Sequence, residues 1–231
     1  MNDCSFIAKF KRLTYIIIAM KAAIKKRTAP KEERQQQLIQ ATIRSVASKG
    51  LSDTTMATVS REAGLSQGII NLHFQSKDRL LVETLRFLSE QYQSAWEKAV
   101  FKAGDAPADK LAAMVATDFK PPVCDRNKLA VWFAFWGESK SRPTYRKICA
   151  MRDMAYRVEM VQVCKELVEK GGYEDIDSGS VAAGLSAMTS GLWLDLLTNP
   201  RSMSRERAKQ ICMSYLATTF PRHFPARSVQ T

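Results

Sequence analysis

Apolar residues between positions 54 and 77 recur at intervals of three and four, a spacing that predicts helices. The apolar face of a first helix comprises Met56, Val59 and Ala63. Gly64 then permits a left-handed turn at little steric cost, and Ser66 is a good N-cap for a second helix. The second helix buries Ile70 and Phe74 and leaves its polar residues exposed. This pattern is typical of a helix-turn-helix, although an ordinary helical hairpin in a core has the same spacing.

The rest of the chain also has helical periodicity, without the alternation that is typical of strands. A helix with an acidic first turn precedes the pair and ends at Gly50. A long helix begins at Lys77, with Ser76 as its cap. Proline, glycine and capping residues divide the remainder into expected helices 107–119, 127–140, 143–171, 177–199 and 204–220. The pattern predicts an all-α protein, with a three-helix module at 30–76 and a larger helical domain at 77–221.

Positive charge is concentrated around the predicted helix-turn-helix. The chain of 231 residues carries a net charge of +12. Residues 1–80 contain 14 Lys and Arg against 6 Asp and Glu, whereas the remaining 151 residues contain 21 against 17. A basic excess in this region favours an anionic partner, so double-stranded DNA is expected and a hairpin in a core is less favoured.

The segment 1–29 is basic and is predicted to be an N-terminal extension, with a C-terminal tail at 222–231. The short apolar run within segment 1–29 resembles the start of a signal peptide, but Lys21 interrupts this run. A second interpretation is that translation begins at Met20. The cluster 25–27 would then form a basic arm ahead of the first helix.

The scarcity of metal-binding and catalytic residues argues against enzyme classes. Five scattered cysteines, without C-x-x-C spacing, indicate the reducing cytoplasm: Cys4, Cys124, Cys149, Cys164 and Cys212. With only His73 and His223 in the chain, no metal site is expected. We find neither a nucleophile–base pair nor a phosphate-binding glycine loop, so neither an enzyme nor a cofactor is expected.

The predicted DNA contacts follow from residue type and position. Thr55, Thr58 and Lys77 flank helix N-termini and suit phosphate oxygens. The exposed residues of the second helix are Gln67, Gly68, Ile69, Asn71 and His73. Glutamine and asparagine suit adenine edges, and isoleucine suits a thymine methyl group. A protein that coats DNA without sequence preference remains an alternative, which competition with scrambled DNA would reveal.

The chain resembles TetR-family transcriptional repressors. The matching segments are 58–60, 63–66, 68–70, 73–74 and 76–77, in the same order and spacing. Asn71 and Leu72 stand where many members have tyrosines, so a tyrosine contact to the DNA backbone is not carried over. The resemblance implies a dimer that reads a near-palindromic operator and is released by an inducer bound in the helical domain. The candidate interface for this homodimer is the helix 177–199 with the last helix.

A finer resemblance is to the BetI subfamily, choline-responsive repressors of genes for glycine betaine synthesis. The segments that carry it are 129–139, 142–146 and 191–194. It implies a choline-like inducer and a homodimer, with no membrane partner. A regulator with a different ligand, such as a lipophilic cation, that controls an efflux or catabolic gene is the alternative.

Aromatic residues supply a physical basis for such a ligand. A quaternary ammonium cannot donate hydrogen bonds, so aromatic faces hold it, at about 0.5–2 kcal/mol each. The candidate ligand-binding residues are Trp132, Phe133, Trp136, Tyr145 and Trp193, with Phe135 and Tyr156 as further candidates. Glu138 or Asp195 would supply a counter-charge. The alternative is that these rings only fill space between helices. Ligand binding is expected to tilt the helix that begins at Lys77.

Overall fold

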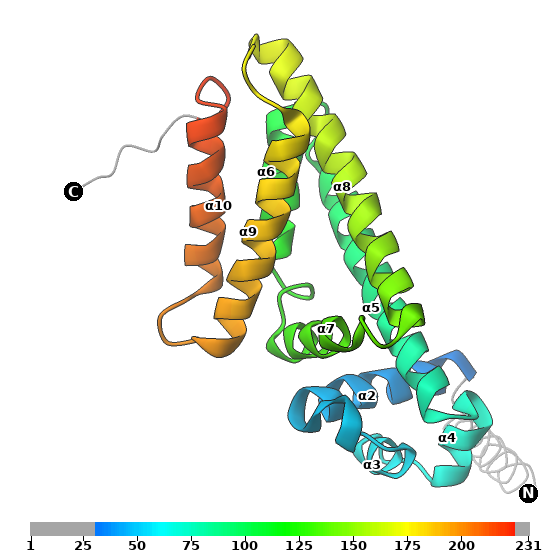
Figure 1. The fold of residues 1–231 in the computed structure, drawn as a ribbon. Coiled ribbons are helices and arrows are strands. Elements are labelled where there is room, and N and C mark those ends of the chain that lie inside the picture. Colours follow the sequence, from blue (N-terminus) through cyan, green and yellow to red (C-terminus); the bar gives the residue numbers. More distant parts are fainter. Residues whose placement is uncertain (1–30, 225–231) are drawn as a thin grey trace, which may run out of the picture.

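The computed structural model describes residues 31–224, and every regular element in that range is an α-helix (Figure 1). The all-α prediction is therefore confirmed. The helices are α2 (Lys31–Asp53), α3 (Met56–Glu62), α4 (Gln67–Phe74), α5 (Lys77–Lys102), α6 (Pro107–Asp118), α7 (Arg126–Glu138), α8 (Pro143–Gly171), α9 (Ser178–Thr198) and α10 (Arg205–Thr219). The predictions for the segment 1–29, including the start at Met20 and the basic arm, lie outside the described residues, as does most of the tail at 222–231.

Helices α2, α3 and α4 form the N-terminal module, whose turns lie at two glycines. Gly50 has a φ of 79° and interrupts the helical backbone near the end of α2, where the sequence predicted a stop. Gly64 has a φ of 65° and forms the left-handed turn between α3 and α4. Both conformations strain residues that carry a Cβ atom. Ile70 and Phe74 of α4 are buried, as their spacing predicted.

Side-chain caps fix several helix starts. Ser76 accepts a hydrogen bond from the backbone N–H of Arg79 at 3.2 Å, so the predicted cap of α5 is confirmed. Ser66 occupies the N-cap position of α4, but its side chain makes no capping hydrogen bond. The predicted position of Ser66 as the N-cap of α4 is therefore confirmed.

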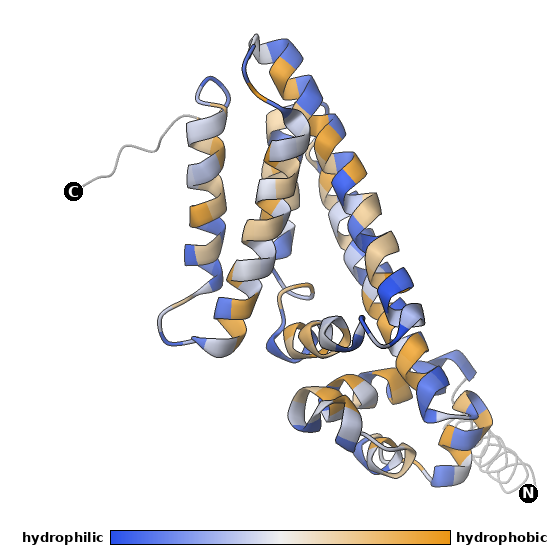
Figure 2. Ribbon diagram, in the orientation of Figure 1, coloured by the Kyte–Doolittle hydropathy of each residue, from blue (hydrophilic) through white to orange (hydrophobic). Residues whose placement is uncertain are grey.

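The larger part of the fold is a bundle of α5, α6, α8, α9 and α10, with α7 between this bundle and α2 (Figure 1). Figure 2 shows apolar and polar residues alternating along the long helices α5 and α8. On α5 the buried residues Leu81, Leu85, Leu88 and Tyr92 recur at helical spacing, as expected for an amphipathic helix that lines a core. Helix α9 is long and apolar enough by composition to cross a membrane, but it packs against α7, α8 and α10, as a core helix does.

Two apolar cores hold the chain together, and α7 contributes to both. One core fills the bundle, from Leu111 of α6 to Leu216 of α10. The other contains Leu38 and Ile70 of the N-terminal module together with Val131, Trp132 and Phe135 of α7, and Tyr145 and Cys149 of α8. The N-terminal module therefore shares its core with α7 and the first part of α8. A displacement of α7 reaches α2 through packed side chains.

The cysteines of the described residues are small buried residues. Cys124, Cys149, Cys164 and Cys212 are all buried, and none forms a disulfide. Burial raises the pKa of the Cys164 thiol to about 12 and that of Cys212 to about 11. These thiols stay protonated near neutral pH, which makes them poor nucleophiles.

Candidate DNA-binding and ligand-binding sites

Helix α4 presents a polar face to solvent. Gln67, Gly68 and Asn71 are exposed, and Ile69 is half-buried. Leu72 lies on the same helix and is 79% exposed. An apolar side chain this exposed suits a thymine methyl group or a deoxyribose, whereas the sequence indicated Leu72 only as a departure from the tyrosine of many family members.

His73 differs from its predicted position on the exposed face. Its ring is half-buried, and its Nδ1 atom is buried without a hydrogen-bond partner among the described residues. The reason is helical geometry: residue 73 is three positions after buried Ile70 and next to buried Phe74, so it lies at the edge of the buried stripe. Only part of this ring is available to a partner.

The two threonines assigned to phosphate form a capping box at the start of α3. Thr55 Oγ1 accepts from the Thr58 backbone N–H at 3.1 Å, and Thr58 Oγ1 accepts from the Thr55 backbone N–H at 2.8 Å. The Thr58 hydroxyl in turn donates to the Thr55 carbonyl at 2.9 Å. These bonds satisfy N–H groups that a helix start otherwise leaves without partners.

Lys77, the third residue assigned to phosphate, joins two helices. Its Nζ atom donates to the carbonyl oxygen of Ser52 at 2.9 Å, which ties the start of α5 to the end of α2. On the other side of the module, Gln37 Nε2 donates to the Ala63 carbonyl at 2.7 Å. The start of α5 and the end of α3 are therefore both tied to α2.

A box of aromatic rings lies where α5, α7, α8 and α9 meet. The ring centroids of Trp132 and Trp136 on α7 are 6.2 Å apart. Trp193 of α9 stacks on Trp136 at 6.5 Å, and Tyr92 of α5 meets Trp193 edge-on at 6.0 Å. Three of the five predicted ligand-binding residues thus come together, and Tyr92 is a fourth member that the sequence did not indicate.

The other two predicted residues do not face this box. Phe133 lies behind it, with its ring edge-on to Trp136 at 5.0 Å. Tyr145 packs edge-on against Phe135 at 4.8 Å, in the core shared with the N-terminal module. The position of Tyr145 at the start of α8 brings it toward α7 and α2 instead.

The guanidinium group of Arg152, on α8, sits inside the box. Its Cζ atom lies 4.3 Å from the ring centroid of Trp132, 5.0 Å from that of Tyr92, 5.3 Å from that of Trp136 and 6.0 Å from that of Trp193. The side chain is 7% exposed. It donates to Asp153 Oδ1 through Nε, at 2.7 Å, and through Nη2. Its Nη1 atom is buried without a hydrogen-bond partner among residues 31–224.

A buried carboxylate, Asp118 at the end of α6, lies behind the rings. It accepts hydrogen bonds from the hydroxyls of Tyr92 at 2.8 Å and Tyr156 at 2.7 Å, and from that of Thr189 at 3.3 Å. The Trp193 indole N–H donates to the Asp118 backbone carbonyl at 2.8 Å. These bonds fix the two tyrosine rings and the tryptophan around one acidic residue.

Burial raises the pKa of Asp118 from its usual 3.8 to about 6, although the hydrogen bonds from Tyr156, Tyr92 and Thr189 and the charge of Arg152 oppose the rise. Burial also raises the pKa of both tyrosines well above 10, and the charge of Asp118 adds to this. Both tyrosines therefore remain neutral donors. The box has a carboxylate that is ionised near neutral pH and titrates just below it.

Asp118 takes the place of the counter-charges expected from the sequence. Asp195 instead accepts a hydrogen bond from the Asn199 side chain at 3.2 Å, and Glu138 accepts one from the Ser141 hydroxyl at 3.3 Å. A signal for Asp118 did exist in the sequence. Leu111, Met114 and Val115 form the buried stripe of α6, and position 118 continues it at helical spacing.

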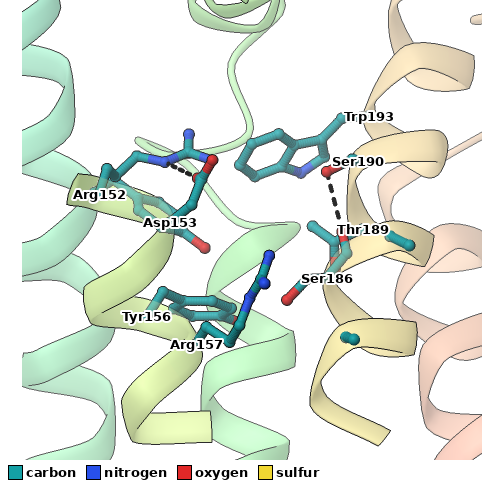
Figure 3. Close-up of a pocket in the computed structure, with 11 residues that line it drawn as sticks. Arg152, Asp153, Tyr156, Arg157, Ser186, Thr189, Ser190 and Trp193 are labelled. Carbon is teal, nitrogen blue, oxygen red and sulfur yellow. Dashed lines mark hydrogen bonds and ion pairs between the residues drawn. The ribbon is translucent and has the colours of Figure 1, made fainter. Parts of the chain in front are cut away.

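A cavity of about 210 Å³ adjoins the box between α8 and α9. Figure 3 shows Arg152, Tyr156 and Arg157 on one side and Ser186, Ser190 and Trp193 on the other. The cavity thus combines aromatic faces, hydroxyls and charged groups of both signs. Sites of this kind hold small ligands through apolar contact with a few fixed polar groups.

Two family models match the chain. The model described as bacterial regulatory proteins, tetR family, matches residues 38–84. The model described as BetI-type transcriptional repressor, C-terminal, matches residues 107–221. Together they cover the N-terminal module from residue 38 and every residue of the aromatic box and the cavity except Tyr92.

Similar proteins and structures agree with this match. The HTH-type transcriptional regulator BetI of Burkholderia thailandensis is 34% identical over 164 residues, which cover 71% of this chain and 82% of the relative. The regulator of the same name from Stenotrophomonas maltophilia is 29% identical over 183 residues, 79% of this chain and 91% of the relative.

Among solved structures, a putative transcriptional regulator from Pseudomonas aeruginosa PAO1 matches with a TM-score of 0.74 and 29% identity, over 86% of this chain and 97% of that one. A putative transcriptional regulator from Saccharomonospora viridis, solved in complex with choline, matches with a TM-score of 0.70 and 23% identity, over 80% of this chain and 96% of that one. With the helix-turn-helix and the helical bundle, these matches show that the chain belongs to the TetR family of transcriptional regulators, with a C-terminal domain of the BetI type, and is not an enzyme.

Proposed function

We propose that the protein is a cytoplasmic, homodimeric repressor that binds a near-palindromic operator, is released by choline, and controls genes for glycine betaine synthesis. The observation that carries the choline assignment is the aromatic box with a buried carboxylate behind it. Aromatic faces attract a quaternary ammonium, and a carboxylate near them adds a charge that a neutral ligand would not use. The BetI relatives and the choline complex of the S. viridis regulator support the same ligand.

The size of the cavity favours a small cation over a bulky lipophilic one. Pockets for drug-sized ligands commonly occupy about 300–1,000 Å³. The cavity here is about 210 Å³, and two arginines and five hydroxyl residues line it. A regulator of an efflux gene that senses large apolar cations is therefore less favoured.

DNA recognition is assigned to α4. Gln67 and Asn71 are exposed and would read adenine edges, and Leu72 and Ile69 would contact thymine methyl groups. The start of α3, with its capping box, would face a phosphate. Each protomer would read one half-site, so a two-fold dimer matches a near-palindrome.

The dimer is assigned to α9 and α10. Along α9, the small residues Ala183, Ala187 and Gly191 are exposed at intervals of four, and the larger Leu194 is exposed three positions further on. A row of small exposed side chains lets a second helix approach closely, as in a four-helix interface between two copies.

Ligand binding would act on DNA through α7. Trp132 contacts the box on one side and belongs to the core shared with α2 on the other. A ligand that alters the packing of Trp132 shifts α7 against α2, and thereby the separation of the two copies of α4. The helix α5 supplies a second connection through Tyr92. The ligand shifts the equilibrium only by its differential affinity for the two states.

The test is operator release. An operator is selected from random duplex DNA with the purified protein, and its binding is titrated with choline chloride. Sodium chloride at equal concentration is the control, because ionic strength alone weakens protein–DNA binding. We expect release by choline at concentrations where sodium chloride has no effect. Equal effects of the two salts would rule out choline as the inducer and would leave the DNA-binding assignment intact.

A further inference from the structure

We propose that Arg152 is a built-in occupant of the aromatic box, so that a cationic ligand binds by exchange with its guanidinium group. This inference rests on the proposed function, since it concerns how that site selects its ligand and how the site changes when the ligand binds. The observation is the position of the guanidinium: four aromatic rings have their centroids within 4.3–6.0 Å of its Cζ atom. These are the ring faces that a quaternary ammonium would need.

A guanidinium and an ammonium use the same attraction. Each is held by the negative face of an aromatic ring, and neither tolerates a second cation against that face. Because the Arg152 side chain is 7% exposed, it fills the box instead of covering its rim. A ligand cation therefore cannot simply add to this arrangement, and Arg152 must leave.

Few other contacts hold the guanidinium in the box. Its ionic partner, Asp153, is the next residue of the same helix, and the Asp153 side chain is 42% exposed. This pair can turn outward as a unit, without separating the two charges. Nη1 is buried without an acceptor, a state that disfavours the closed form. Departure of Arg152 thus costs the ring contacts and the electrostatic attraction to Asp118.

The adjoining cavity offers the displaced group a destination. Arg152, Asp153 and Arg157 all line the cavity of about 210 Å³ between α8 and α9. A guanidinium that moves into this space reaches water and keeps Asp153 as its partner. The carboxylate of Asp118 remains behind the box, held by the hydroxyls of Tyr92 and Tyr156, and its charge attracts the incoming cation.

Exchange explains how one side chain can report on the ligand. With Arg152 in the box, Trp132 is packed against a flat cation at 4.3 Å. A tetrahedral ammonium cannot reproduce that stacking, so Trp132 must repack, and Trp132 lies in the core shared with α2. Arg152 therefore stabilises the ligand-free packing of α7, and its departure is the local event that the ligand causes.

The first test compares two charge-removing variants of the full-length protein. Binding of tetramethylammonium and of choline is measured by calorimetry for wild type, Arg152→Gln and Arg157→Gln. If Arg152 competes for the box, the first variant binds both cations at least about tenfold more tightly, because the box is then always open. Arg157 lines the cavity without contacting the rings, so Arg157→Gln should gain less than about threefold through charge alone. Unchanged or weaker binding by Arg152→Gln, or equal gains in the two variants, would refute the exchange.

The second test fills an emptied box. In Arg152→Ala, methylguanidinium should raise the melting temperature and compete with tetramethylammonium, whereas it should do neither in wild type at the same concentration. A purely structural role for Arg152 predicts no such competition. Failure of methylguanidinium to compete in a folded Arg152→Ala protein contradicts the proposal.

A measurement on the wild type does not depend on how these variants fold. The Nε–Hε NMR signal of Arg152, assigned by its absence from the Arg152→Lys spectrum, should be shifted by ring currents and should move to an ordinary position on saturation with tetramethylammonium. A signal that stays in place at saturation disproves exchange. If exchange occurs and choline still fails to release the operator, the proposed function fails while the role of Arg152 stands. If choline releases the operator but the Arg152 signal does not move, the exchange fails while the proposed function stands.

Discussion

The Tyr156 hydroxyl donates a 2.7 Å hydrogen bond to the buried carboxylate of Asp118, across 38 positions of the chain. Tyr92 does the same at 2.8 Å. These bonds hold two neutral hydroxyls and one carboxylate within the apolar interior. Because Tyr92 presents its ring to Arg152 and to Trp193 and packs against the ring of Tyr156, Asp118 organises the box without being part of its surface.

Removal of the Asp118 charge should weaken cation binding. In Asp118→Asn the side chain keeps its size and one acceptor oxygen, but the box loses the buried negative charge. We expect the affinity for tetramethylammonium, measured by calorimetry at pH 7.5, to fall by roughly tenfold or more. Asp195→Asn is the matched control, since Asp195 lies outside the box and should change the affinity little. Equal losses in both variants would contradict a local role for Asp118.

The raised pKa of Asp118 also predicts a dependence of stability on pH. Between its usual value of 3.8 and about 6, the folded protein binds more protons at Asp118 than the unfolded chain does. The free energy of unfolding contributed by this group therefore falls as pH rises from about 4 to about 6, by on the order of 3 kcal/mol, and is level above that. Other carboxylates titrate in the same range, so the measured quantity is the difference between wild type and Asp118→Asn in urea melts. A flat difference over this range would contradict the prediction.

The affinity for the ligand should depend on the ionisation of the same carboxyl group, and it should rise with pH where the free energy of unfolding falls. A cation favours ionised Asp118, so the affinity for choline should rise with pH up to about 6 and then level off. Charged neighbours from every packed element bear on this group: Arg152 of α8 lowers its pKa, while Tyr92 and Tyr156 stay neutral. In Asp118→Asn the affinity should not vary between pH 5 and 7. Calorimetry in buffers with different ionisation enthalpies would detect the proton released on binding.

The capping box at the start of α3 should contribute measurably to the free energy of unfolding of the N-terminal module. Thr55→Ala removes the acceptor for the Thr58 backbone N–H, so we expect a loss of about 1 kcal/mol in urea unfolding. Thr218→Ala, in the last turn of α10, removes only a bond to the carbonyl of Ser214 and is the control. If Thr55 also contacts a phosphate, Thr55→Ala weakens binding to all DNA sequences alike. A loss confined to the operator would argue for base recognition instead.

Most of the fold is predictable from the sequence because local signals mark the helix ends. Ser76, Pro107, Pro143 and Ser204 stand at helix starts in the structure as in the prediction. Side-chain directions within one helix are also predictable, and Trp132 and Trp136, four positions apart, lie on one face of α7 as their spacing predicts.

The rest of the box could not be predicted, since it depends on how separate helices cross. Tyr92, Arg152 and Trp193 meet from α5, α8 and α9, and no local spacing specifies that meeting. Tyr145 was predicted to line the ligand site but lies outside the box, because its helix starts against α7 and directs the ring toward Phe135. Arg152 is hidden for a further reason: an arginine in an amphipathic helix is usually solvated.

Asn71 should contribute to sequence recognition rather than to general DNA affinity. It is exposed on α4, and Asn71→Ala should cost about 1–3 kcal/mol on the selected operator. The slope of log K against log salt should stay the same, because an asparagine displaces no counterion. Gln93→Ala, on the exposed face of α5, is the control. A loss that is equal on scrambled DNA would place Asn71 on the backbone instead of a base.

The coupling between the box and α4 should depend on the core that α7 shares with α2. Phe135 is fully buried in that core and does not contact Arg152. Phe135→Leu should change the affinity for choline by less than about threefold relative to wild type. It should reduce the factor by which bound operator weakens choline binding, because a looser core transmits less of the α7 displacement. Phe220→Leu makes the same change in the core of the bundle, beyond α7, and should keep the factor. The factor is the ratio of choline dissociation constants with and without operator. If both variants reduce it equally, general destabilisation is the cause and α7 is not the connection.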